Sequence, residues 1–143
     1  PSILQDMGMQ TVFHKLNVKP GKPLLFGLLG DAYIFGLPGN VVSVLTSFHL
    51  FVKPALRLLT GVSTWRNPVT YARVAVRIYN PGSRTQFIRC RLSPQKDGLP
   101  LAIPTGRQES NRLTSMLEAD GFAVIPGEKE TVEELDIVEF IPL

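Results

Sequence analysis

Apolar and polar positions alternate with the two-residue period of a β-strand in the first part of the chain. The segment TVFHKLNV, residues 11–18, places Val12, His14, Leu16 and Val18 on one side and Phe13, Lys15 and Asn17 on the other. The preceding PSILQDMGM is typical of a last helical turn that ends at Gly8. Two short apolar runs, LLFGLL and AYIFGL, flank Gly30-Asp31 and predict a buried hairpin or two neighbouring strands.

The period becomes helical after the turn GLPGN, residues 36–40. Asn40 is suited to cap the start of this helix and Gly61 to end it, whereas Pro54 should kink or split it. The apolar residues at helical spacing are Val41, Val44, Leu45, Phe48, Val52, Ala55, Leu56 and Leu59, with Ser43, Ser47, Lys53 and Arg57 largely off that face. A strand, a tight turn and a long helix indicate half of an α/β layer.

The chain becomes rich in predicted strands after residues 62–70, a segment without periodicity. RVAVRIY places Val74, Val76 and Ile78 on one face and Arg73 and Arg77 on the other; FIRCRL does the same with Ile88, Cys90 and Leu92 against Arg89 and Arg91. LPLAIP, GFAVIP and DIVEFIPL are further strands, and ESNRLTSMLEA adds one short helix. We therefore predict an α/β region over residues 1–63 and an all-β barrel or sandwich over residues 64–143.

The composition of the 143 residues, 44% apolar and 19% charged, is that of a globular protein. The single cysteine, Cys90, excludes an internal disulfide and favours a reducing, cytoplasmic location. We expect no membrane partner, because no apolar stretch stays free of charge for long enough to cross a bilayer. The chain begins at Pro1, and its α/β region has too few strands for a complete layer, so we expect it to be part of a longer protein.

The net charge of +3 conceals an uneven distribution of charges along the chain. Lys and Arg outnumber Asp and Glu by nine to two over residues 64–112, but the ratio is one to eight over residues 113–143. The basic middle lacks the interleaved aromatic residues of a nucleic-acid-binding surface, and the acidic tail can neutralise it. We therefore expect no nucleic-acid partner.

Candidate chemistry gathers at two turns that precede the long helix. In KPGKP, Lys19 and Lys22 flank a rigid Pro20-Gly21 turn that keeps both ammonium groups close together. In GLPGN, a helix start offers backbone amides to an anion. A purely structural role stays open for each polar residue that could bind an anion or react. Asn40 would be a simple helix cap, Lys15 and Lys22 would be solvated surface residues, and Ser110 and Ser115 would be capping or surface serines. Arg89 would lie on a solvent face of its strand, His14 and His49 would be structural residues, and Cys90 would be part of the core.

Five segments resemble, in their order along the chain, the molybdopterin molybdotransferases of the MoeA type, which include the gephyrin E domain. The segments are FHKLNVKPGKP, GLPGNVVS, LFVKPALRLLTG, FIRC and TGRQESNRLTSM. The resemblance implies that this chain is the C-terminal third of such an enzyme: the end of a molybdopterin-binding α/β domain, then a β-barrel domain. It also implies insertion of molybdate into adenylylated molybdopterin with release of AMP, Mg²⁺ ligands upstream of this chain, and a homodimer.

The resemblance assigns roles to specific residues of this chain. It implies a molybdate-holding set of Lys19, Lys22, Ser43, Arg89 and Ser115, and it implicates Lys15, Pro38 and Ser110, with Gly39 and Asn40 as part of an oxyanion cradle. The sequence departs from the family at two positions: Val41 replaces a proline that presets the helix start, and Arg107 replaces a histidine. The glycine-rich GGVS loop of the family is absent, so we expect the chain alone to be inactive.

Two other functions stay open. A binding or scaffolding module would expose an apolar groove near the barrel and would not need an intact anion site. A degenerate member of the same family would fit the replacement of proline by Val41.

Overall fold

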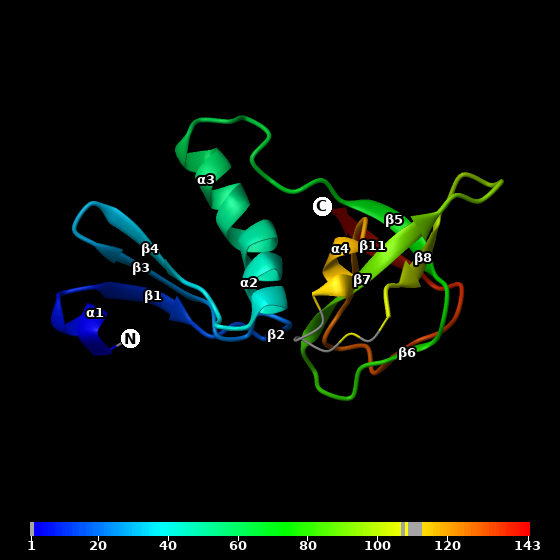
Figure 1. Ribbon diagram of the computed structural model, residues 1–143, viewed down its shortest axis with the longest axis horizontal. Coiled ribbons are helices and arrows are strands. Elements are labelled where there is room, and N and C mark those ends of the chain that lie inside the picture. Colours follow the sequence, from blue (N-terminus) through cyan, green and yellow to red (C-terminus); the bar gives the residue numbers. More distant parts are fainter. Residues whose placement is uncertain (1, 107, 109–112) are drawn as a thin grey trace.

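The computed structural model describes residues 2–106, 108 and 113–143, with the elements arranged as in Figure 1. In chain order they are α1 (Ser2–Asp6), β1 (Gln10–His14), β2 (Val18–Lys19), β3 (Leu25–Leu29), β4 (Ala32–Gly36), α2 (Val41–Ser47), η1 (Phe48–Val52), α3 (Lys53–Leu59), β5 (Thr70–Val74), β6 (Ile78–Tyr79), β7 (Thr85–Ser93), β8 (Leu101–Pro104), α4 (Thr114–Leu117), β9 (Gly121–Ile125), β10 (Thr131–Val132) and β11 (Ile137–Pro142).

The first sheet consists of β1, β3 and β4. The predicted hairpin is confirmed, since β3 and β4 pair in antiparallel fashion on either side of Gly30-Asp31. It is less buried than expected, because Ala32 and Tyr33 of β4 are exposed. The single strand predicted over residues 11–18 is wrong in its second half: β1 ends at His14 because Lys15 turns the backbone with a φ of 72°.

The long helix runs from Val41 to Leu59 through α2, a π-helical turn (η1) and α3. Its predicted cap is confirmed: the Asn40 side chain accepts hydrogen bonds from the backbone N–H groups of Val42 at 3.1 Å and Ser43 at 3.4 Å. Pro54 splits α2 from α3 without breaking the helix, because the wider turn before it, closed from Lys53 N–H to Phe48 O, accommodates a residue that lacks an N–H.

The helix buries a different face from the one that its apolar period indicates. The exposed residues include Val41 (54% exposed) and Phe48 (43%), together with Leu45, Leu56 and Leu59. The buried residues of α2 are Val42, Ser43, Thr46 and Ser47. An apolar stripe at helical spacing normally faces a core. Within the described residues, the face with the hydroxyl groups is the one that packs against neighbouring elements.

By length and composition, Val41–Leu59 is the one helix among the described residues that is long and apolar enough to cross a bilayer, contrary to the sequence expectation. Of its most apolar window, 44% is buried inside the protein. Core helices of soluble proteins satisfy the same criterion, so this finding is weak evidence for a membrane.

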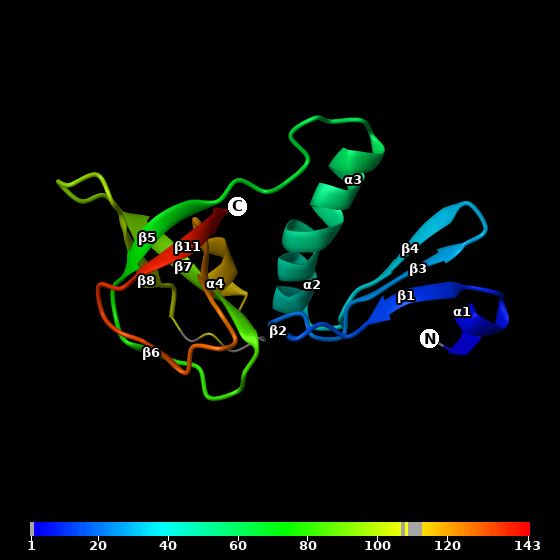
Figure 2. The same ribbon diagram turned by 180° about the vertical axis from the view of Figure 1, so that it is seen from behind.

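The second region is a closed barrel (Figures 1 and 2). Strands pair in the order β7-β8-β5-β11-β9, and β9 pairs again with β7. Closure leaves no barrel edge unpaired, which decides between the predicted barrel and sandwich. The barrel core consists of Ala72, Val74, Ile78, Ile88, Cys90, Ala102, Ala123, Ile125, Val132, Val138 and Phe140.

The strand predicted over RVAVRIY, residues 73–79, is wrong in its middle. It ends at Val74 in β5 and resumes at Ile78 in β6, which pairs with β10 instead of the barrel strands. Because the chain leaves the barrel between these elements, Val76 is exposed although it has the same parity as Val74 and Ile78.

A second apolar cluster joins the two regions, and we call it the junction cluster. Its members are Leu50, Phe87, Met116 and Phe122, with Val18, Phe51, Val124 and Ile141 packed against them. They come from β2, from η1 of the long helix, and from β7, α4, β9 and β11 of the second region. Backbone pairing reinforces the packing, because β2 adds to β7 as a parallel strand, with Lys19 opposite Gln86.

His49 links the long helix to the last strand of the barrel. Its ring nitrogen Nε2 lies 2.8 Å from the carbonyl oxygen of Pro142, and Asn67 Nδ2 donates to the His49 carbonyl at 3.1 Å. Burial lowers the pKa of His49 below its usual value, the bond to Pro142 acts in the opposite direction, and the nearby Lys53 and Arg57 lower the pKa further. The structural role expected for this histidine is therefore consistent with its contacts.

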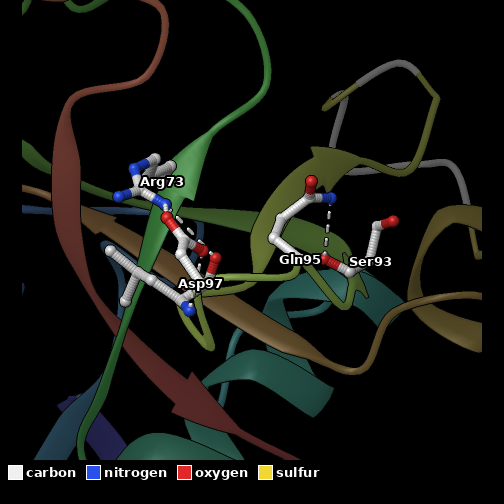
Figure 3. Close-up of polar contacts among 5 residues, drawn as sticks. Arg73, Ser93, Gln95 and Asp97 are labelled. Carbon is white, nitrogen blue, oxygen red and sulfur yellow. Dashed lines mark hydrogen bonds and ion pairs between the residues drawn. The ribbon is translucent and has the colours of Figure 1, made fainter.

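The turn between β7 and β8 projects from the barrel and is held by surface contacts (Figure 3). Arg73 Nη1 of β5 donates to Asp97 Oδ2 at 2.7 Å, and Gln95 Nε2 donates to the Ser93 carbonyl at 3.3 Å. The hydrogen bond from Arg73 lowers the pKa of Asp97, and a bond from the backbone of Leu99 adds to this effect.

Candidate functional site

A loop over residues 15–24, which we call the lysine loop, carries three predicted site lysines, Lys15, Lys19 and Lys22. The Lys15 N–H donates to Leu24 O at 2.9 Å, and the Leu16 N–H donates to Lys22 O at 2.8 Å. These bonds close the base of the loop, so that Lys22 lies at its base and Lys19 lies nearer its tip. Both residues are exposed, as is Lys15.

The tip of the lysine loop rests on the hydroxyl-bearing face of the long helix. Gly21 is buried and has a φ of +100°, and a Cβ placed on it would lie 2.7 Å from Ser47 Oγ. Ser43 lies one helical turn before Ser47 on the same face and is also buried. The predicted residues Lys19, Lys22 and Ser43 therefore lie near one contact. It joins Gly21, which has no room for a side chain, to the long helix.

The GLPGN turn has fewer donors for an anion than its sequence suggested. A helix start leaves four backbone N–H groups without a helical partner. Here the Asn40 side chain accepts from two of them, those of Val42 and Ser43. Pro38 is buried, whereas Gly39 is exposed. An anion at this turn would therefore depend on the amides that precede Val42.

Arg89 and Ser115 form a pair inside the second region. Arg89, on β7, is 0% exposed, and its Nε donates to Ser115 Oγ of α4 at 2.8 Å. This corrects the alternative that Arg89 lies on a solvent face of its strand: α4 and the junction cluster cover that side of β7. Burial lowers the pKa of Arg89, yet an arginine stays protonated at neutral pH. The pair therefore places a positive charge in the interior.

Both halves of the predicted set adjoin the junction cluster. Lys19 follows Val18 of the cluster, and Ser115 precedes Met116. Arg89 lies three residues along β7 from Gln86, the partner of Lys19. The predicted site residue Ser110 lies outside the described residues, as does Arg107, the residue that departs from the family pattern.

Two residues with contacts to the Arg89–Ser115 pair were missed by the sequence reasoning. Thr105 and Gln108 both make hydrogen bonds to the main chain of Arg89, and Thr105 also contacts the main chain of Ser115. The sequence signal for them is their position in the TGRQ segment, residues 105–108, whose spacing does not predict these bonds.

Cys90 lies beside Arg89 on β7 but faces the barrel core. Burial raises its pKa to about 12, although a backbone hydrogen bond from Ala123 and the charge of Arg89 act in the opposite direction. A thiol with this pKa is a poor nucleophile at neutral pH. Cys90 is part of the barrel core, as predicted.

The described residues contain no group of three or more His, Cys, Asp and Glu side chains that could hold a metal ion. They do line an open hollow of about 730 Å³ beside the segment after α3. Its walls include Arg57 and Arg66, whose guanidinium lies 4.3 Å above the Trp65 ring. None of the predicted site residues that the structure describes lines this hollow.

Comparison with known families and structures gives a consistent result. Residues 71–143 match the family model of the MoeA C-terminal region (domain IV), and residues 2–58 match a probable molybdopterin binding domain. A MoeA structure from Pyrococcus horikosii is similar with a TM-score of 0.75 at 30% identity, over 99% of this chain and 34% of that one. This likeness confirms the predicted fold class, an α/β segment followed by an all-β barrel.

The names of curated relatives also refer to molybdopterin or to molybdenum cofactor synthesis. The chain is 36% identical over 126 residues to the molybdenum cofactor synthesis protein cinnamon of Drosophila melanogaster, covering 87% of this chain and 21% of that protein. It is 30% identical over 142 residues to a molybdopterin molybdenumtransferase of Haemophilus influenzae, covering 99% of this chain and 35% of that protein. The chain therefore spans about a third or less of the length of these relatives.

Proposed function

Since the chain belongs to the MoeA family, we propose that it is the C-terminal part of a molybdopterin molybdotransferase. The reaction is the insertion of molybdate into adenylylated molybdopterin, with hydrolysis of the adenylate and release of AMP. Residues 1–63 complete a molybdopterin-binding α/β domain, and residues 64–143 form the C-terminal β-barrel domain. The names of the curated relatives support a role in molybdenum cofactor biosynthesis.

The observation that carries the proposal is the buried Arg89–Ser115 pair, because Arg89 lies on β7, the strand with which Lys19 of the lysine loop pairs. The pair places a positively charged guanidinium and a hydroxyl group side by side. Molybdate is a tetrahedral dianion, and charge-assisted hydrogen bonds from Lys and Arg bind such ions most strongly. Lys19 and Lys22 supply further charge, while the Ser43 and Ser115 hydroxyls direct hydrogen bonds to its oxygens.

The remaining family assignments belong to the same proposal. Lys15 and Ser110 contribute to the active site, and Pro38, Gly39 and Asn40 form a turn whose backbone amides are part of an oxyanion cradle. Mg²⁺ belongs to the same proposal, with its ligands on the preceding part of the enzyme. We propose a homodimer in the cytoplasm for the complete protein.

The exposed apolar stripe of the long helix supports the proposal that this chain is part of a longer protein. Val41, Leu45, Phe48, Leu56 and Leu59 expose large apolar side chains along one helix. Contiguous apolar surface of this kind usually marks an interface. We propose that the rest of the molybdopterin-binding domain covers it.

The test measures AMP release and active cofactor from the full-length protein at limiting molybdate. Lys19→Ala and Lys22→Ala should each raise the KM for molybdate about tenfold or more, because a hydrogen bond to a charged group contributes roughly 1.5–3 kcal/mol. Lys96→Ala removes an exposed lysine from the turn between β7 and β8 and serves as the matched control. Unchanged molybdate use in both loop variants would contradict the proposed site.

A further inference from the structure

Arg89 lies at the end of a β-ladder, where its main chain needs other partners. Strand β8 ends at Pro104, opposite Cys90, so Arg89 is one residue beyond the β7–β8 pairing. Two residues that follow β8 continue the ladder. The Thr105 N–H donates to Arg89 O at 2.9 Å, and the Arg89 N–H donates to Gln108 Oε1 at 2.9 Å. Gln108 Nε2 returns a bond to Arg89 O at 3.1 Å, so one side-chain amide replaces a strand neighbour.

The Thr105 hydroxyl connects this ladder to α4. Its oxygen lies 2.5 Å from Ser115 O and 3.1 Å from Arg89 O. A hydroxyl has one proton, and the shorter contact identifies the Ser115 carbonyl as its acceptor. Thr105 is buried, so water does not compete for this bond. Through its N–H and its hydroxyl, Thr105 ties the main chains of Arg89 and Ser115 together.

Among the described residues, the hydrogen bonds that link α4 to the barrel include those from the Thr105 hydroxyl and from Arg89 Nε. The helix has four residues, Thr114–Leu117, and no side chain caps its first turn. Met116 anchors it in the junction cluster by apolar contact, which does not fix an orientation as a hydrogen bond does. The bond from Arg89 Nε to Ser115 Oγ at 2.8 Å therefore depends on where Thr105 holds the helix.

We propose that Thr105 and Gln108 are positioning residues for the oxyanion site: they fix the Arg89 guanidinium and the Ser115 hydroxyl in the relative position that binds molybdate. This inference rests on the proposed function. Neither residue touches the anion in this scheme, and both act through the main chain of the residues that do. Binding of an anion by several groups requires that they be held together before it arrives, so loosening one of them weakens the site without removing a charge.

The test compares Thr105→Val with Thr105→Ser in the full-length protein. Valine keeps the branched shape and removes the hydroxyl, whereas serine keeps the hydroxyl. Thr105→Val should raise the KM for molybdate about tenfold with a much smaller change in kcat, since a misplaced binding group chiefly affects binding. Thr105→Ser should restore the KM to within about threefold of the parent protein. Gln108→Leu, measured in parallel, should raise the KM in the same way and keeps the test valid if the valine variant does not fold.

The outcomes separate this inference from the proposed function. A residue that only stabilises the fold would lower the amount of active enzyme, and hence the apparent kcat, with the KM unchanged. That result for Thr105→Val and Gln108→Leu, with Arg89→Ala defective in molybdate use, would overturn the positioning role alone. If Arg89→Ala itself used molybdate normally, the proposed site would be wrong.

Discussion

Replacing Gly21 by alanine tests whether the lysine loop is seated on the long helix by direct contact. Two features of Gly21 oppose a side chain. Its φ of +100° is a conformation that other residues rarely adopt, and an added Cβ would lie 2.7 Å from Ser47 Oγ. The two effects can be measured separately, because only the second depends on Ser47.

The expected magnitudes follow from these two features. Strained backbone at a non-glycine residue costs about 1–3 kcal/mol, and overpacking costs about 1–3 kcal/mol, so Gly21→Ala should lower the free energy of unfolding by about 2–6 kcal/mol. In the double variant with Ser47→Ala, the closest atom becomes Ser47 Cβ at 3.9 Å, which is an ordinary contact. That variant should therefore lose only the backbone cost, about 1–3 kcal/mol.

Ser47→Ala alone provides the control. Its hydroxyl is buried without a hydrogen-bond partner among the described residues, so its removal should leave stability unchanged or raise it slightly. Urea unfolding of the four proteins, followed by far-UV circular dichroism, gives the coupling energy between the two positions. Equal destabilisation of Gly21→Ala with and without Ser47→Ala would refute the contact.

Three further predictions concern other parts of the chain. Val41→Pro should raise the free energy of unfolding by about 0.4–1 kcal/mol and tighten molybdate binding, because proline suits the first position of a helix. A variant that melts at a lower temperature would mean that the local backbone differs from the family geometry. Asp97→Asn should flatten the pH dependence of stability below about pH 4. Because the pKa of Asp97 is lowered in the folded state, its carboxylate stabilises the fold above the unfolded pKa, and this stabilisation is lost as the pH falls through the folded pKa. An unchanged profile of stability between pH 2 and about pH 4 would contradict this prediction. Cys90 should resist alkylation by iodoacetamide at pH 7.5 in folded protein and react after unfolding in urea, because its pKa is raised to about 12; rapid labelling of the folded protein would argue against a core position.

Local sequence signals predicted the elements whose structure is decided locally. The Gly30-Asp31 hairpin, the Asn40 cap and the strand around Cys90 follow from turn chemistry, capping and alternation. Elements that depend on distant partners were missed. The two-residue strand β2 exists because β7 lies beside it, and the break at Val76 exists because β6 pairs with β10.

The orientation of the long helix could not have been predicted from this sequence. A helical period identifies which face is apolar, but it does not tell which face the elements of this chain cover. Here they cover Ser43 and Ser47, while Val41 and Phe48 stay exposed. The same limit applies to the site: residue types predicted Arg89 as a candidate, but its burial and its bonds to Thr105 and Gln108 depend on how the barrel closes.

The junction cluster has a consequence for how such a protein can be rearranged by recombination. The aperiodic segment 62–70 lies between the two regions, so it is an obvious place at which to join the parts of two related genes. A crossover there would combine Val18 and Leu50 from one parent with Phe87 and Phe122 from the other, although these side chains share one core. Viable chimaeras should therefore carry compatible changes on both sides of the crossover, so the barrel and the preceding helix are exchanged successfully only as one inherited block.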